Sequence, residues 1–282
     1  MTTLRASVLV LALAAGLPAG AAEPLVVGRF SAFAAGDGLP PGWEPVRFRN
    51  VARATDYRLV DDGGVVVMRA ESRAAASALV RPVSVDTTDY PVLQWRWKVA
   101  APVPGEIGRR EADDFAARVY VGFAEDPQTL GAWERLKVTL IRFLYGRTPP
   151  LAVLNYVWAD TEPVGTVAPS PFTARVRLVV VESGAQRAGE WVTVRRDLVV
   201  DYRRAFGRRP PPVTDIGIMT DTDGTGTDAT AYYGDIALLP AGRATAGGGA
   251  PIYTGPASVP ARGVPARAGQ VSLDTSGAAG IN

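Results

Sequence analysis

The stretch "VLQWRWKV", Val92 to Val99, decides the fold class. Its apolar and polar residues alternate, so Trp95 and Trp97 fall on one face of an extended chain while Arg96 and Lys98 fall on the other. A period of two is typical of a strand with one buried face. The stretch therefore predicts a sheet with a tryptophan-bearing core side and a basic outer side.

The same alternation recurs through residues 23–240. In "DDFAARVYVGF" (113–123), one row holds Phe115, Ala117, Val119, Val121 and Phe123, and the opposite row holds Asp114, Arg118 and Tyr120. Turn-bounded strands are also expected at 57–60, 65–72, 76–83, 151–159, 174–183, 190–200, 215–221 and 229–239. So many short strands predict a mainly β fold, an antiparallel jelly-roll-like β-sandwich.

One segment has helical periodicity instead. Asp126 and Pro127 suit the start of a helix, Gly146 suits its end, and the apolar residues between them share one face. We expect one inserted α-helix at about 127–145, packed over an edge or end of the sandwich. "DYRRAFGRRPPP" (201–212) predicts one short helical turn that stops at Gly207.

The two ends differ in composition from the rest. Val8 to Leu17 is a ten-residue apolar run, shorter than the ~20 residues that span a bilayer, and small residues follow it. This predicts a signal peptide at 1–22, export to the periplasm and no transmembrane segment. The region 241–282 is rich in Gly, Ala and Pro, which predicts a disordered tail after a single domain at 23–240.

Charge and composition exclude several functions. The chain has 30 basic and 28 acidic residues; four basic residues and one acidic residue fall in the two ends, which leaves 26 and 27 in 23–240. A near-neutral domain does not favour nucleic acid as a partner. Because the chain has no cysteine and no histidine, Ser-His-Asp, Cys-His and zinc-histidine sites are excluded.

A candidate binding face combines two of the expected strands. If those strands are neighbours in one sheet, Arg96, Asp114, Arg118 and Tyr120 share its outer face, where planar and bidentate contacts to a polar ligand are favoured. The alternative is that this face of the sheet is solvated and binds no ligand. Trp158, near the end of its strand, is interpreted either as a platform for a sugar ring or as part of the core.

Aspartates cluster in "MTDTDGTGTDATAYYGDIALL" (219–239). Asp221 and Asp223 are two residues apart in a glycine- and threonine-rich turn. Three interpretations stay open: side chains that bond the turn backbone, oxygen ligands of Ca²⁺, and contacts to a bound ligand at the rim.

Several stretches together resemble an exported bacterial family, domain of unknown function 3047. They are "YPVLQWRWKV", "DDFAARVYVGF", "LNYVWA", "RDLVVDYRRAFG" and "IMTDTDGTGTDATAYYGDI". The resemblance implies a signal peptide, a β-sandwich and no assigned activity; Gly224 stands where the family usually has asparagine. "YYGDIALL" is also similar to the closing strand of jelly-roll carbohydrate-binding modules, which implies a structural calcium at Asp235.

These observations favour an exported, non-catalytic protein that binds a carbohydrate or similar polar molecule. Two alternatives remain: a glycoside hydrolase or lyase that uses Asp and Tyr, and a structural or interaction protein of the envelope. A glycosidase needs two carboxylates about 5–9 Å apart across a cleft. Asp113 and Asp114 do not fit, because adjacent strand residues point to opposite faces.

Overall fold

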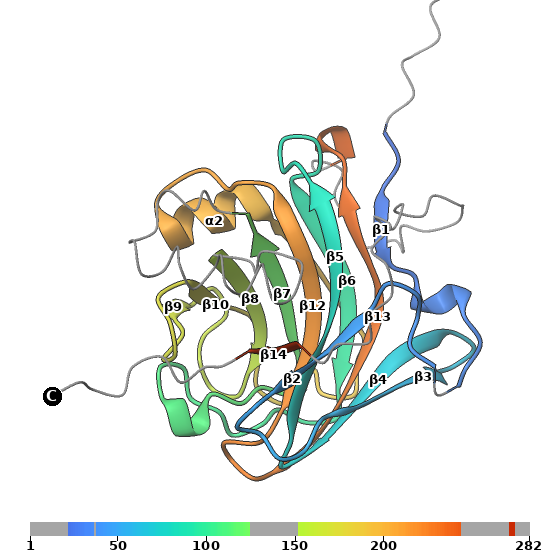
Figure 1. Cartoon of the computed structure of the whole chain (residues 1–282), viewed down its shortest axis with the longest axis vertical. Coiled ribbons are helices and arrows are strands. Elements are labelled where there is room, and N and C mark those ends of the chain that lie inside the picture. Colours follow the sequence, from blue (N-terminus) through green and yellow to red (C-terminus); the bar gives the residue numbers. More distant parts are fainter. Residues whose placement is uncertain (1–21, 37, 125–151, 244–270, 274–282) are drawn as a thin grey trace, which may run out of the picture.

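Two β-sheets pack face to face in the computed structural model, which describes residues 22–36, 38–124, 152–243 and 271–273 (Figure 1). Sheet A has the order β11 (Val192–Asp197), β6 (Val92–Val99), β13 (Asp228–Leu239), β4 (Val66–Arg73) and β3 (Asp56–Asp61), with β1 (Leu25–Gly28) also paired to β13. Sheet B has the order β14 (Val271–Leu273), β2 (Glu44–Phe48), β5 (Ala76–Val85), β12 (Val213–Asp221), β7 (Arg118–Phe123), β8 (Ala152–Ala159), β10 (Val176–Ser183) and β9 (Val167–Pro169). The predicted β-sandwich is confirmed.

Pairing within the sheets is mostly antiparallel. β8 pairs with β10 in parallel, as does β2 with β14, and the other pairs are antiparallel among the described strands. In Figure 1 the β4–β5 turn and the β12–β13 loop lie together at one end of the sandwich, and backbone bonds from Ala74 N to Thr227 O and from Thr222 N to Ala75 O (both 2.9 Å) join them.

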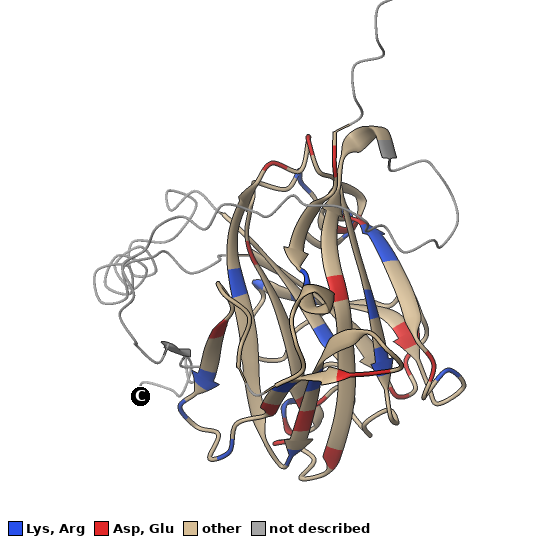
Figure 2. Cartoon of the chain, turned by 90° about the vertical axis from the view of Figure 1, so that its right-hand side faces the viewer, with Lys and Arg blue, Asp and Glu red and all other residues tan. Residues whose placement is uncertain are grey.

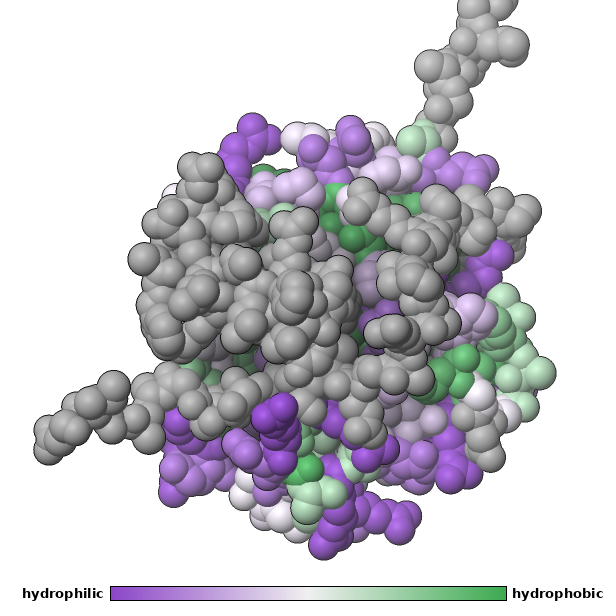
Figure 3. All heavy atoms as spheres, viewed as in Figure 1, coloured by the Kyte–Doolittle hydropathy of each residue, from purple (hydrophilic) through white to green (hydrophobic). Residues whose placement is uncertain are grey.

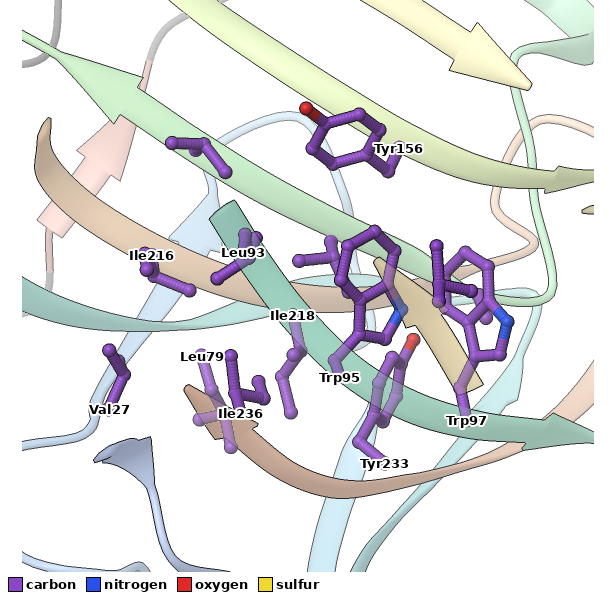
Figure 4. Close-up of a cluster of buried hydrophobic side chains, with 14 of the residues drawn as sticks. Val27, Leu79, Leu93, Trp95, Trp97, Tyr156, Ile216, Ile218, Tyr233 and Ile236 are labelled. Atoms are coloured by element: carbon purple, nitrogen blue, oxygen red, sulfur yellow. The ribbon is translucent and has the colours of Figure 1, made fainter. Parts of the chain in front are cut away.

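The core lies between the sheets and is rich in aromatic rings. Trp95 and Trp97 of β6 are 1 % and 0 % exposed, as alternation predicts. The Trp95 ring centroid lies 5.2 Å from that of Tyr156, across the gap from sheet A to sheet B (Figure 4). The Trp97 ring centroid lies 6.0 Å from that of Trp158 in the same way. Burial of such rings is the main stabilising contribution in a chain that has no disulfide.

Helix α2 (Leu198–Phe206) closes one end. Asp197 accepts hydrogen bonds from the amides of Val199 and Val200. Gly207 ends the helix with φ 73°, as predicted, but the helix is longer than the single turn expected, because it begins at Leu198, inside the predicted strand 190–200. Asp201, a residue of α2, accepts hydrogen bonds from Arg196 Nη2 (2.5 Å) on β11 and from Tyr156 Oη (2.9 Å) on β8. This bond network ties α2 to both sheets.

Two predicted segments fall mostly outside the described residues, and the predicted tail has some regular structure. The expected helix at about 127–145 and nearly all of the predicted signal peptide (1–22) lie outside the described residues. In the predicted tail (241–282), Ala241–Arg243 forms a 3₁₀ turn and Val271–Leu273 forms β14. No helix of the described ranges is both long and apolar enough to cross a bilayer.

Candidate functional site

The predicted shared face of Arg96 and Arg118 is wrong. Arg96 lies on β6 in sheet A, whereas Arg118 lies on β7 in sheet B, with β12 and β8 as its neighbours. The prediction that Phe115 shares one strand face with Val119 is also wrong. Phe115 precedes strand β7, which begins only at Arg118. Its ring packs with Val157 and Leu178 in a cluster apart from the main core.

Arg118 is buried at the centre of an acidic cluster, which comprises Asp113, Asp114, Asp221 and Asp223. Its Nε donates to Asp221 Oδ1 (2.7 Å) and its Nη2 to Asp221 Oδ2 (2.5 Å), while Asp113 Oδ2 lies 3.5 Å from Nη2. The side chains of Arg118 and Asp221 are each 3 % exposed. Such a bidentate internal pair leaves neither group available to a ligand in solution.

Asp114 stabilises the β12–β13 loop. Its Oδ1 accepts from Gly224 N (3.2 Å), and its Oδ2 accepts from Thr225 N (2.6 Å) and Thr225 Oγ1 (2.7 Å). A side chain at Gly224 would meet Glu111 O at 2.9 Å, so this loop needs a residue without Cβ. Asp114 therefore bonds a neighbouring loop rather than a sugar.

Asp114, Asp221 and Asp223 each place one carboxylate oxygen within 4.8 Å of the others, so the three could hold a metal ion. Both oxygens of Asp221 already bond Arg118, and both of Asp114 bond backbone amides. Only Asp223 is exposed. An ion bound by this cluster would therefore compete with the Arg118 guanidinium for Asp221, and a glycosidase role for Asp114 or Asp221 would have to compete with the same internal bonds.

The remaining predicted site residues also bond within the protein. Trp158 is 0 % exposed and donates from Nε1 to Gly184 O (3.0 Å), so the core interpretation holds for this ring. Tyr120 donates to Met219 Sδ (3.4 Å) on sheet B. Asp235 accepts from Ser31 N (3.0 Å) and Ser31 Oγ (2.5 Å), which fixes the 3₁₀ turn Phe30–Ala32 against β13.

Stability should fall as pH rises from about 5 to about 8. Burial raises the pKa of Asp221 from 3.8 to about 7, against the lowering effect of Arg118. The folded state then holds a proton that the unfolded state releases near pH 4, so this contribution to stability is lost as the pH rises through 7. Urea titrations across this range measure it. Asp221→Asn should flatten the slope, and a rise in stability over this range would contradict the assignment.

An open array of polar and aromatic residues lies instead on the outer face of sheet A. Lys98 pairs with Tyr232, Tyr232 with Arg69, and Arg69 with Arg58, across β6, β13, β4 and β3. Trp191, one residue before β11, extends this line beside Lys98. We call these five residues the cross-strand row. Four inter-strand spacings make it about 19 Å long.

Cation–π contacts organise the row at its β11 end. Arg96 Cζ lies 4.6 Å from the Trp191 ring centroid, and Lys98 Nζ lies 5.3 Å from that centroid and 4.4 Å from that of Tyr232. Asp62 accepts from Lys98 Nζ (2.7 Å) and from Trp191 Nε1 (2.7 Å). The Lys98 bond is the main reason that the pKa of Asp62 is lowered.

Gly234 makes room for Arg96 on this face. A Cβ at position 234 would overlap the Arg96 side chain, in the irregular part of β13 between Tyr233 and Ile236. The arginine therefore has room to lie over the partly exposed ring of Trp191. Figure 2 shows the basic and acidic bands on the strands of the side where β3 and β4 lie in Figure 1.

Sequence reasoning found Arg96 but missed most of this face. Alternation in "VLQWRWKV" already places Lys98 beside Arg96, and alternation in 190–200 places Trp191 on an outer face. The missing information is the register of Tyr232 against Lys98 and Arg69. Such long-range pairing leaves no local pattern.

Comparisons with solved structures find several proteins of low sequence identity. A family 30 carbohydrate-binding module of a Clostridium thermocellum cellulosomal cellulase is 14 % identical, covers 77 % of this chain and 92 % of its own, and has a TM-score of 0.33. The Emp47p carbohydrate recognition domain is 11 % identical, with 80 % of this chain and 99 % of that domain covered and a TM-score of 0.39. A family 12 xyloglucanase from Bacillus licheniformis is 6 % identical, with 78 % of this chain and 100 % of that chain covered and a TM-score of 0.38. Likeness at this level says nothing of ligand or activity.

No curated protein matches the sequence. Residues 41–237, more than half of the chain, match the family described as protein of unknown function (DUF3047). This agrees with the resemblance of the strand and loop motifs. The chain belongs to the DUF3047 family.

Proposed function

We propose that this protein is an exported, non-catalytic binding protein that holds a carbohydrate or similar polar molecule on the outer face of sheet A. The observation that carries the proposal is the cross-strand row. It combines partly exposed rings, at Trp191 and Tyr232, with cationic donors on β6, β4 and β3. Aromatic faces stack on apolar ring surfaces, and charged donors bond hydroxyl or acidic oxygens.

The face is organised before a ligand arrives. Lys98 is held between Asp62 and two rings, and its side chain is only 16 % exposed. Arg96 is fixed over Trp191 by the space at Gly234. Groups fixed in this way lose little conformational entropy on binding, so more of the contact energy is available for affinity.

A glycan array followed by calorimetry tests the proposal. The protein without its first 22 residues should bind at least one class of extracellular or envelope glycan, with heat that saturates at one site. Absence of binding to every neutral and acidic glycan on the array would contradict the proposal. An assay for reducing-end release on each bound glycan would reveal the hydrolase alternative.

A further inference from the structure

A groove of about 450 Å³ lies at the β3–β4 end of the cross-strand row. The side chains that matter in its lining are Arg53, Asp56, Arg58, Arg69, Glu71 and Arg73. Arg69 belongs to both the groove and the row, where it pairs with Tyr232. The groove, here called the arginine groove, is therefore continuous with the face proposed to bind a carbohydrate.

The charges in the groove do not balance. Its two carboxylates each have an arginine partner: Asp56 Oδ2 lies 2.8 Å from Arg58 Nε, and Glu71 Oε2 lies 3.5 Å from Arg69 Nη2. Arg53 and Arg73 are both exposed, and within the described ranges neither forms a salt bridge with a carboxylate. Asp228 stands opposite Arg73 in the β4–β13 register but does not line the groove. Two positive charges therefore remain in a groove of an otherwise near-neutral domain.

The main chain fixes where these two arginines sit. Ala76 N donates to Arg53 O (3.1 Å), and Arg53 Nη1 donates to Arg73 O (3.4 Å). Next to Arg73, Ala74 has φ 46°, a left-handed conformation that is rare for a residue with Cβ. Its amide bonds Thr227 O (2.9 Å), so the turn that presents Arg73 is tied to the next loop.

We propose that the arginine groove selects acidic glycans, and that it binds their carboxylate or sulfate groups while the sugar chain lies along the cross-strand row. This inference rests on the proposed function. A guanidinium presents paired N–H donors that match the paired oxygens of a carboxylate or sulfate, which a neutral hydroxyl does not offer. Arg53 and Arg73 are the specificity-determining residues.

The experiment compares oligosaccharides of equal length by calorimetry: one neutral, one uronic acid and one sulfated. Sodium acetate and sodium sulfate serve as free-anion probes. Wild-type protein should bind an acidic oligosaccharide at least about tenfold more tightly than the neutral one, and more tightly than either free anion. The double variant Arg53→Gln/Arg73→Gln should reduce this preference to about threefold or less, with neutral binding unchanged.

A control variant separates local contact from general charge. Arg203→Gln/Arg204→Gln removes two exposed charges from α2, far from β3 and β4 in Figure 1, and should keep the preference. Equal loss in both double variants would overturn the inference, as would an unchanged preference in Arg53→Gln/Arg73→Gln. Neutral binding without acidic preference would overturn the inference alone, whereas absence of all glycan binding would overturn the proposed function. Melting temperatures verify that each variant is folded.

Discussion

Replacing Arg118 with methionine should lower the free energy of unfolding by about 3–5 kcal/mol, because the change leaves a buried carboxylate without its partner. Arg118 bonds both oxygens of Asp221, contacts Asp113 and lies over the Phe115 ring at 4.4 Å. Methionine keeps much of the volume but supplies no donor. Urea denaturation followed by circular dichroism measures the loss.

The variant should also respond to pH. Arg118 is the main influence that lowers the pKa of Asp221, so its removal should cause Asp221 to take up a proton. The destabilisation should then be smaller at pH 5 than at pH 8. Arg109→Met is a matched control, because Arg109 is 61 % exposed and pairs with Glu106 at 3.3 Å; its effect should stay within about 1 kcal/mol. A similar small effect for Arg118→Met would show that the buried pair does not stabilise the fold.

Trp191→Ala should weaken glycan binding by about 2 kcal/mol or more, roughly 30-fold in Kd. The change removes the ring at one end of the cross-strand row and the surface against which Arg96 and Lys98 are held. Because Trp191 is partly exposed and its strand neighbour Val192 carries the local core contact, the fold should persist. Calorimetry with the glycan that the array identifies gives the Kd.

Phe172→Ala is the matched control for this prediction. Phe172 is 37 % exposed and lies 5.3 Å from Arg110 Cζ, so it forms a similar cation–π pair away from sheet A. It should bind like the wild type. If Phe172→Ala lost as much affinity as Trp191→Ala, the effect would not be local to the cross-strand row.

Alternation predicted the strands well because each strand carries its own pattern of burial. β6 spans Val92–Val99 as expected, with Trp95 and Trp97 inside and Arg96 and Lys98 outside. Strand pairing has no such local signal. Nothing in the sequence of β6 and β7 shows that they belong to different sheets, so the condition for a shared face of Arg96 and Arg118 could not be checked from the sequence.

The acidic cluster shows a second limit of prediction from sequence alternation. Alternation correctly places Arg118 on the opposite side of β7 from Val119, but it does not reveal what covers that side. The amide of Phe115 donates to Asp221 Oδ1 (3.2 Å), so the segment before β7 lies against the pair and excludes water. Figure 3 shows hydrophilic residues along the lower edge of the molecule. Arg118 and Asp221 are charged but buried, so polarity in the sequence does not by itself predict exposure.

Tryptophan fluorescence tests the location of the binding face most directly. Of the tryptophans in the described ranges, Trp43, Trp95, Trp97 and Trp158 are buried and only Trp191 is partly exposed. Titration with the bound glycan should change the emission of the wild type and of Trp133→Phe, a control for a tryptophan outside the described ranges. The emission of Trp191→Phe should stay constant. A change of equal size and midpoint in Trp191→Phe would place the ligand elsewhere and contradict a binding site on sheet A.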